Sequence, residues 1–316
     1  MTRLTRPGRR FTLGSRGSHL ARAMAEEVLG KLRSLHPEVD FSHRVVTTRG
    51  DRDRRTQLSL LGGDYGGVFT KELEVALVAG EIDVAMHSLK DLPTVLPDGL
   101  SIAAVTARDE PGDALCGAHL ASLELGARVG TGSPRRRAQL LHVRPDLDIV
   151  QVRGNIVPRL SRLKASASLA AIVLAAAGLR RVGLAAEATE LLPVEEFVPA
   201  AGQGAIALEV RTADVELTSI VKAIEDPSTR ASVTAERSVL HQLGGGCSVP
   251  LGAYCVVTDS GLRLHARVTS LDGRRDVEAD LAGPVSDPER LGTDVAEVLL
   301  RNGAAEVLDE IVAGRT

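Results

Sequence analysis

The first two hundred residues alternate short β-branched runs with stretches of helical periodicity. The runs RRFTLGS, SHRVVTT and IDVAM are typical of strands, and a helical pattern separates each from the next. Strands and helices that alternate in this way form open α/β sheets with crossover helices. Because ligands bind beyond the carboxyl ends of the strands in such sheets, the loops after these runs are where we look for a site.

The stretch SHLARAMAEEVLGKLRSLHP shows the helical pattern most clearly. Ser18 is a suitable N-cap for it, and apolar residues recur near helical spacing. We expect these apolar residues to lie in the core, namely Leu20, Met24, Val28, Leu32 and Leu35.

The pattern of an apolar run that ends in a glycine or polar loop continues further along the chain. It recurs in LSIAAVT, ARVGTGS, LDIVQVRGN, LAAIVLAAAG and GQGAIALEVR. The last ninety or so residues differ. After the helical STRASVTAERSVLHQLGGG, apolar and polar residues alternate around the turn signals TDSG and LDG, and two amphipathic stretches follow from about residue 287. The sequence therefore predicts two α/β units and a C-terminal α+β domain with a small antiparallel sheet.

Composition argues against several classes of protein. The net charge of −3, the 2% of aromatic residues and the lack of Trp do not fit a nucleic-acid-binding protein. No stretch approaches the roughly 20 apolar residues of a membrane span. The segment MTRLTRPGRRFTLGS is basic but lacks the apolar core of a secretory signal, so we expect a cytoplasmic protein.

The three cysteines call for separate explanations, because an odd number in a reducing compartment argues against a disulfide framework. Cys255 alternates with Leu251, Ala253 and Val257, which predicts a core position. Cys247 follows three glycines in LGGGCSVP and lies on a loop. A loop thiol is either a tolerated accident or a site of covalent attachment or nucleophilic chemistry, and the residues alone leave both open. No His or Cys spacing predicts a zinc site.

The segment TGSPRRRAQL predicts an anion site at the start of a helix. Ser133 is the expected N-cap and Pro134 the first helical residue, so Arg135, Arg136 and Arg137 occupy the first turn. A helix N-terminus carries partial positive charge, and three arginines there cost stability unless an anion compensates them. Since a helix start also binds anions through its free N–H groups, we favour an anion site over a solvated basic surface.

Cationic residues recur after the other strands. Arg16 and Ser18 follow the first strand, Lys90 and Asp91 follow IDVAM, Arg153 and Arg159 follow IVQV, and Arg180 and Arg181 follow AAIVLAAAGL. Together they predict a cationic cleft for a small ligand with several carboxylates or phosphates, which arginine binds in bidentate geometry. Asp91 is the acid of this set. It is either an ion-pair partner or a group that stabilises a cationic intermediate, and spacing does not separate the two.

The chain resembles the porphobilinogen deaminase (hydroxymethylbilane synthase) family from about residue 10 to the C-terminus. The resemblance rests on TRGD, KELEVAL, HSLKDLPT, GTGSPRRRAQL, VRGN, AAAGLRR, PAAGQGA, TAERS and GGGCSVPLGAY, which occur in the family's order and spacing. HSLKDLP and GGCSVP are highly specific to it. The chain departs from the family at LLGGDYGGV, where many relatives have a lysine-bearing lid near GGKG. We expect LGGDYGGVF to be a mobile lid.

The resemblance implies a three-domain transferase whose first two domains are similar to the lobes of type II periplasmic binding proteins. The implied domains are residues 1–105 with 204–223, residues 106–203, and residues 224–316. The enzyme would join four porphobilinogen molecules head to tail on a dipyrromethane cofactor bound through a thioether to Cys247, with loss of ammonia, and would then release hydroxymethylbilane by hydrolysis. It would be a cytoplasmic monomer that requires no metal and binds neither nucleic acid nor membrane.

The resemblance also implies roles for individual residues. Asp91 would be the catalytic residue, expected to hydrogen-bond pyrrole N–H groups and to stabilise positive charge as it develops. The cofactor would be held by Cys247, Lys90, Asp91, Ser133, Arg135 and Arg136. Incoming substrate and the growing chain would be bound by Arg16, Ser18, Arg153, Arg159 and Arg181.

Overall fold

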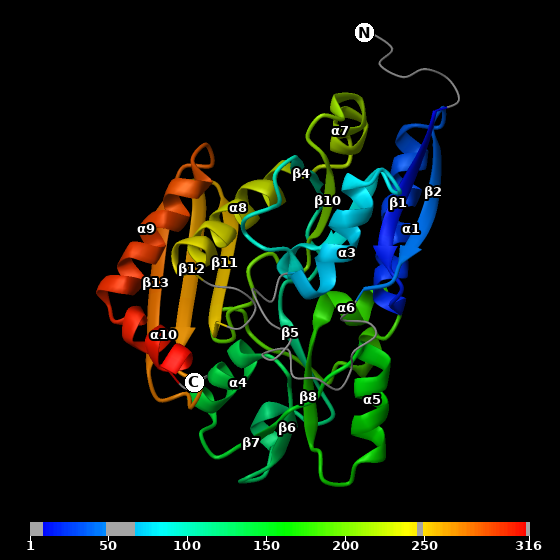
Figure 1. The fold of residues 1–316 in the computed structure, drawn as a ribbon. Helices are drawn as coiled ribbons and strands as arrows, with labels where there is room; N and C mark the ends of the chain where they lie inside the picture. Colours follow the sequence, from blue (N-terminus) through cyan, green and yellow to red (C-terminus); the bar gives the residue numbers. More distant parts are fainter. Residues whose placement is uncertain (1–8, 49–66, 245–248, 314–316) are drawn as a thin grey trace. The chain divides into compact units, whose positions relative to one another are not determined.

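The structure is a computed structural model that describes residues 9–48, 67–244 and 249–313 (Figure 1). It divides into two compact units, residues 1–108 with 205–230, and residues 109–204 with 231–316. No helix in the described ranges is long and apolar enough to cross a membrane.

The first unit contains a five-stranded sheet in the order β2-β1-β3-β10-β4. Its strands are β1 (Arg10–Arg16), β2 (Asp40–Val46), β3 (Val84–Ser88), β4 (Leu100–Val105) and β10 (Ile206–Arg211). β1 is parallel to β2 and β3, whereas β10 is antiparallel to both β3 and β4. The helices of this unit are α1 (His19–Leu35), α3 (Gly67–Val78) and α7 (Val215–Lys222).

Helix α1 begins as the sequence predicts. The Ser18 hydroxyl accepts a hydrogen bond from the backbone N–H of Ala21 at 3.2 Å, which satisfies one of the free donors of the first turn. Of the five apolar residues expected in the core, Met24, Val28 and Leu32 are buried and Leu20 packs partly buried against them. The prediction is wrong for Leu35, which is 53% exposed because it is the last residue of the helix.

The second unit contains a sheet with the same arrangement of strand directions, in the order β7-β6-β8-β5-β9. Its strands are β5 (Asp113–Cys116), β6 (Arg128–Gly130), β7 (Asp148–Val150), β8 (Ala171–Ala175) and β9 (Glu190–Leu191). β6 is parallel to β7 and β8, and β5 is antiparallel to β8. The helices α4 (Pro134–Val143), α5 (Ile156–Ala165) and α6 (Ala176–Arg181) follow β6, β7 and β8.

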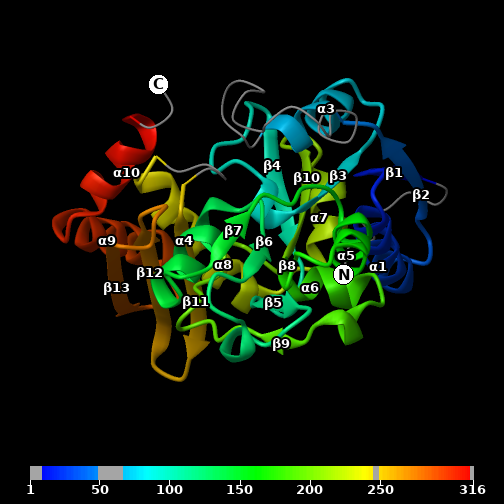
Figure 2. The same cartoon turned by 90° about the horizontal axis from the view of Figure 1, so that it is seen from below.

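The second unit also contains the predicted antiparallel sheet, β11-β12-β13. The strands β11 (Leu251–Thr258), β12 (Gly261–Thr269) and β13 (Asp276–Gly283) turn at TDSG and LDG as expected. α8 (Pro227–Gln242), α9 (Pro288–Arg301) and α10 (Ala304–Ala313) share a core with this sheet. Figure 2 shows α9 and α10 beside β12 and β13. Cys255 lies in this core, but Val257 is 42% exposed, so its predicted burial is wrong at the end of the strand.

The fold class is therefore mixed α/β, with two five-stranded sheets and a small antiparallel sheet. The three domains expected from the resemblance stay a prediction, because the compact units of this structure number two and the second contains two of the three sheets.

Candidate functional site

In the first unit, the predicted site residues follow two neighbouring strands. β1 and β3 are parallel, with Leu13 opposite Val84 and Gly14 opposite Ala85, so their carboxyl ends lie at the same edge of the sheet. Arg16 is the last residue of β1, and Ser18 caps the helix that follows. This edge therefore places Arg16 and Ser18 beside the end of β3.

The end of β3 leads into a short 3₁₀ helix, η2 (Leu89–Asp91), which carries Lys90 and Asp91. The backbone N–H of Leu89 donates to the carbonyl of Ala205 at 3.0 Å, and the side chain of Leu89 is fully buried. Lys90 and Asp91 are half-buried. The turn that presents them is thus anchored by its first residue.

A buried group of titratable side chains lies behind this turn, and the sequence did not single it out as a site. His87 on β3 contacts Glu209 on β10, with 3.0 Å between Nε2 and Oε2, and both side chains are almost fully buried. Glu74 on α3 is also buried. Burial raises the pKa of Glu74 and the charge of Glu209 raises it further, whereas a hydrogen bond from Thr70 acts in the opposite direction.

In the second unit, six of the predicted residues follow three parallel strands. Val129 lies opposite Ile149, and Gly130 lies opposite both Val150 and Ile172, so β6, β7 and β8 end at one edge of the second sheet. The loops and helices beyond this edge carry Ser133, Arg135, Arg136, Arg153, Arg159 and Arg181.

The start of α4 has the predicted geometry. Ser133 is the N-cap and its hydroxyl accepts from the backbone N–H of Arg136 at 3.4 Å, while Pro134 is the first helical residue. Arg135 and Arg136 are nevertheless buried rather than projecting into solvent, at 4% and 8% exposure. Only Arg137 of the arginine run is exposed.

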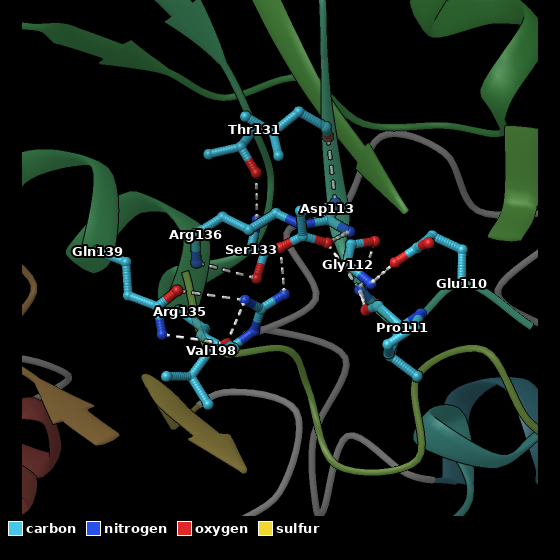
Figure 3. A network of polar contacts seen from close by, with 12 residues as sticks. Glu110, Pro111, Gly112, Asp113, Thr131, Ser133, Arg135, Arg136, Gln139 and Val198 are labelled. Carbon is cyan, nitrogen blue, oxygen red and sulfur yellow. Dashed lines mark hydrogen bonds and ion pairs between the residues drawn. The ribbon is translucent and has the colours of Figure 1, made fainter. Parts of the chain in front are cut away.

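Asp113, the first residue of β5, joins the two buried arginines (Figure 3). Its Oδ2 accepts from Nη2 of Arg135 at 2.8 Å, and its Oδ1 accepts from Nη2 of Arg136 at 2.7 Å. The other contacts of Arg135 are also internal, since its Nη1 donates to the carbonyl of Val198 at 2.8 Å. The anion that compensates this helix start is therefore supplied by the protein itself.

The charge balance at Asp113 follows from these contacts. Burial alone would raise the pKa of Asp113, but the charges of Arg135 and Arg136 lower it by more, and Gln203 adds a hydrogen bond of 2.8 Å. The pKa of Asp113 therefore lies well below its ordinary range, and the carboxylate is ionised at neutral pH. Two cations face this one anion, so the group keeps a net positive charge.

Arg136 is also part of a second group of like charges. Burial, together with the charges of Arg136 and Arg153, lowers the pKa of Arg159 to about 10. Arg159, in the first turn of α5, donates from Nε to the carbonyl of Gly154 at 2.6 Å. A depressed pKa in a guanidinium means that the fold disfavours its charge, and an anionic ligand between these three residues would remove that cost.

Arg181 lies at the last position of α6, as its place after β8 predicts. Its Nη2 donates to the carbonyl of Gly204 at 2.9 Å. The neighbouring Arg180 is instead paired with Asp109 at 3.1 Å. Arg180 thus has a carboxylate partner in the protein, and Arg181 is the residue of this pair that the resemblance assigns to substrate.

The core position predicted for Cys255 is confirmed. Cys116 and Cys255 are free and buried, and burial raises the pKa of the Cys116 thiol to about 11, which makes it unreactive at neutral pH. Cys247 lies outside the described residues, and so does most of the expected lid, LGGDYGGVF. Within the described part of the chain, no group of His, Cys, Asp and Glu has the arrangement of a metal site.

The sequence reasoning missed Asp113 and Gln203. Asp113 begins DALC, a run of four residues that is too short to stand out as a strand, and its partners are more than twenty positions away. Gln203, in PAAGQGA, is 1% exposed and donates from Nε2 to Asp113 and to the carbonyl of Pro111. The available signal was an acid at the start of an apolar run directly after Pro-Gly.

Comparison with known protein families shows to which family the chain belongs. Residues 11–219 match the family described as porphobilinogen deaminase, dipyromethane cofactor binding domain, and residues 231–301 match its C-terminal domain. The chain belongs to the porphobilinogen deaminase family. This family consists of transferases of tetrapyrrole biosynthesis, as the resemblance in the sequence predicts.

Curated members of the family are similar to almost the whole chain. Porphobilinogen deaminase of Desulforudis audaxviator is 46% identical over 309 residues, which cover 97% of this chain and 99% of the relative. The protein of the same name from Synechococcus elongatus is 44% identical over 313 residues, with 97% of each chain covered.

Solved structures include more distant neighbours. A methionine-binding protein, MetQ, has a TM-score of 0.43 and 15% identity over 68% of this chain and 89% of its own. A periplasmic substrate-binding protein of an ABC transporter from Coxiella burnetii has a TM-score of 0.42 and 16% identity, over 72% of this chain and 96% of its own.

The matched cofactor-binding domain covers both described edges. A dipyrromethane carries carboxylate side chains, since the substrate from which it is made bears an acetate and a propionate. Arg136 and Arg153 disfavour the charge of Arg159, and the carboxylates of such a group would relieve that cost. The residues of the second edge therefore fit the cofactor.

Proposed function

We propose that this chain is a hydroxymethylbilane synthase that uses the edges of its two five-stranded sheets for different tasks. The second edge holds carboxylates of the cofactor and growing chain, and the first edge carries the acid that acts on the reacting pyrroles. The observation that carries the proposal is the group of repelling guanidiniums, Arg136, Arg153 and Arg159, in a chain of net charge −3.

At the second edge, Ser133, Arg136, Arg153, Arg159 and Arg181 bind carboxylates. Arg135 has contacts with Asp113, Val198 and Gln139, so it acts on the ligand chiefly by keeping Arg136 and Asp113 in place. Each condensation adds one acetate and one propionate, and several guanidiniums are needed to balance the charge that accumulates.

At the first edge, Asp91 is the catalytic residue. As ammonia leaves porphobilinogen, positive charge develops on the pyrrole, and a fixed carboxylate beside the ring stabilises it. Asp91 also accepts hydrogen bonds from pyrrole N–H groups. Lys90, Arg16 and Ser18 bind carboxylates of cofactor and substrate at the same edge.

Cys247 holds the cofactor by a thioether, which supplies a tethered pyrrole nucleophile for the first condensation. We further propose the three-domain division at 1–105 with 204–223, 106–203 and 224–316. The protein acts as a monomer in the cytoplasm, with porphobilinogen as its small-molecule substrate and no nucleic-acid or membrane partner.

Intact-protein mass spectrometry tests the tether. The wild-type chain should carry the added mass of a dipyrromethane, and Cys247→Ala should lack it and have no activity on porphobilinogen. Cys116→Ala is the matched control, since this thiol is buried, and it should keep the added mass. A fully active Cys247→Ala variant would contradict the assignment of the tether. A wild-type chain without added mass would also contradict it and would favour the alternative hypothesis of a non-catalytic anion-binding protein.

A second experiment tests the catalytic acid. We expect Asp91→Asn to keep the cofactor mass and the melting temperature but to lose at least about 100-fold in kcat, as is usual when a group that stabilises developing charge is removed. Asp98→Asn, a change at an exposed aspartate seven positions further along, should leave kcat unchanged. Equal activity of the two variants would remove Asp91 from the mechanism.

A further inference from the structure

Two contacts within the second unit join helix α4 to the β11-β12-β13 sheet. One runs through residues 196–202, here called the linking segment, and the other through residues 270–275, the hairpin tip between β12 and β13. Both involve glycines at which a methyl group would collide with backbone. The first contact includes the hydrogen bond from Arg135 to the carbonyl of Val198, and the second lies outside the group of Asp113, Arg135 and Arg136.

The linking segment lies between the arginines of α4 and strand β11. The carbonyl of Val198 accepts from Arg135 at 2.8 Å and from Gln139 at 3.1 Å on one side. On the other side, Gly252 of β11 packs so closely that a methyl group there would lie 2.4 Å from the same carbonyl oxygen. The backbone N–H of Ala253 donates to the carbonyl of Pro199 at 2.9 Å.

A buried carboxylate reinforces this contact. Glu236 of α8 is fully buried and accepts from the backbone N–H of Gly202 at 2.7 Å and from that of Cys255 at 2.8 Å. Its two oxygens thus tie the end of the linking segment to the middle of β11. Both hydrogen bonds satisfy backbone N–H groups that would be costly to bury without a partner.

The hairpin tip contacts α4 at Arg137, Leu141 and His142. Gly273 has a φ of 75°, in the left-handed region that favours glycine, and its carbonyl contacts Nδ1 of His142 at 2.9 Å. Arg137 donates from Nε to the carbonyl of Leu271 at 3.2 Å. A methyl group on Gly273 would lie 2.4 Å from the backbone nitrogen of His142 and 2.4 Å from the backbone carbon of Leu141.

The hairpin tip is itself well fixed. Ser270 exchanges backbone hydrogen bonds with its own turn, donating to Arg275 at 2.8 Å and accepting from Gly273 at 2.8 Å. The Ser270 hydroxyl also donates to Asp272 at 2.6 Å. A turn with this many internal bonds does not deform easily, so a displacement of the tip is transmitted to α4.

From these contacts we propose that Gly252 and Gly273 are positioning residues, which lock α4 and the β11-β12-β13 sheet together so that the arginines keep a fixed place relative to β11, the strand that follows Cys247 in the sequence. The inference rests on the proposed function. It means that the strand after the tether, which begins at Leu251, and the helix that carries Arg135 and Arg136 move as one body throughout the four condensations.

Gly273→Ala tests the lock, with Gly261→Ala as the matched control. Gly261 lies in the other turn of the same sheet, also at positive φ (132°), and a methyl group there would meet the carbonyl oxygen of Gly283 at 2.4 Å, away from α4. Both variants should therefore lower the melting temperature. Only Gly273→Ala should displace α4.

We expect Gly273→Ala to lose about tenfold in kcat with little change in KM, because a covalently tethered primer that is out of place is not corrected by more substrate. Gly261→Ala should keep kcat within about twofold, since its strain stays in the sheet. Equal kcat values for the two variants would overturn the proposal.

Hydrogen exchange gives a readout that does not depend on activity. Peptides of residues 134–143 should exchange faster in Gly273→Ala than in Gly261→Ala or the wild type, and unchanged exchange there would overturn the lock. If Gly273→Ala does not fold, His142→Ala removes the contact with the Gly273 carbonyl without adding strain. Hydrogen exchange of residues 134–143 should then also be faster than in the wild type, by a smaller factor. A failure of the proposed function would appear separately, as a wild-type chain without cofactor mass or turnover.

Discussion

Glu74 in the first unit and Asp113 in the second are both buried carboxyl groups, yet their pKa values move in opposite directions. Burial dominates at Glu74, whose neighbours include Glu209, and its pKa is raised. At Asp113 the effect of burial is outweighed by Arg135 and Arg136, and its pKa is lowered. The comparison teaches that depth alone does not set the charge of a buried acid, because the nearest charges decide the sign.

The two regions also differ in the charged groups that they place at their sheet edges. The second unit concentrates positive charge at its sheet edge and uses an internal anion to keep it in place. The first unit buries His87 and Glu209 on strands of its sheet and Glu74 on α3, and it presents Lys90 and Asp91 at the edge of the sheet. Under the proposed function, the binding of carboxylates and the stabilisation of developing charge are assigned to separate electrostatic environments.

Removal of the internal anion should have the largest effect. Asp113→Asn leaves two buried guanidiniums without their partner, so the free energy of unfolding should fall by about 3–5 kcal/mol. Activity should fall with it, because Arg136 loses its fixed position. Chemical denaturation and an assay on porphobilinogen measure the two effects.

Asp146→Asn is the control for this change, because Asp146 is paired with Arg144 but lies at the surface. It should alter neither stability nor activity noticeably. If Asp113→Asn behaved in the same way, the buried pair would not be what holds the arginines.

Removal of the charge of Arg159 should have an intermediate effect, which weakens substrate binding but stabilises the fold when no anion is bound. Arg159→Gln should raise KM for porphobilinogen about tenfold, as expected for the loss of one charged contact. In a Cys247→Ala background, which lacks the tethered anion, the same change should raise the melting temperature by about 1–3 °C, because it removes a charge that the fold disfavours.

The exposed Arg162 on the same helix provides the control, and Arg162→Gln should change neither quantity. A lower melting temperature for Arg159→Gln in that background would mean that the hydrogen bond from Arg159 to Gly154 outweighs the repulsion.

The smallest effect is expected at Glu74. Its raised pKa means that the folded protein favours the protonated form, so the stability it contributes is complete at low pH and is lost as pH rises through the folded-state value. Glu74→Gln should therefore match the wild type in acid and be the more stable of the two in alkali. Melting temperatures measured across pH test this.

Asp113 should show the opposite dependence. Its folded-state pKa lies below the ordinary value, so its contribution is present above that value and is lost as pH falls through the acid range. The stability difference between wild type and Asp113→Asn should consequently shrink in acid. Parallel pH profiles for the Glu74 and Asp113 variants would contradict the comparison.

Local features of this fold could be predicted from the sequence. Ser133 and Pro134 predict the start of α4 because capping depends on neighbours within one turn, and the turn signals at TDSG and LDG predict the antiparallel sheet for the same reason. Errors fell at the ends of elements, as with Leu35 and Val257, where periodicity no longer decides burial.

Features that depend on contacts between residues far apart in the sequence could not be predicted. The arginine run predicted an anion near α4, but the partner, Asp113, reaches it from a short strand placed antiparallel beside β8. The periodicity of apolar residues predicts a strand but not its neighbours in the sheet. The lock at Gly252 and Gly273 likewise depends on close approaches between segments more than fifty residues apart.

The strand order of the first sheet has a consequence for how the chain is made. β10 separates β3 from β4, although it is synthesised about a hundred residues after them. Until the ribosome has released residues 206–211, the two earlier strands have unpaired backbone edges, which are prone to join other chains. The turn that bears Lys90 and Asp91 is thus completed only after most of the polypeptide has emerged.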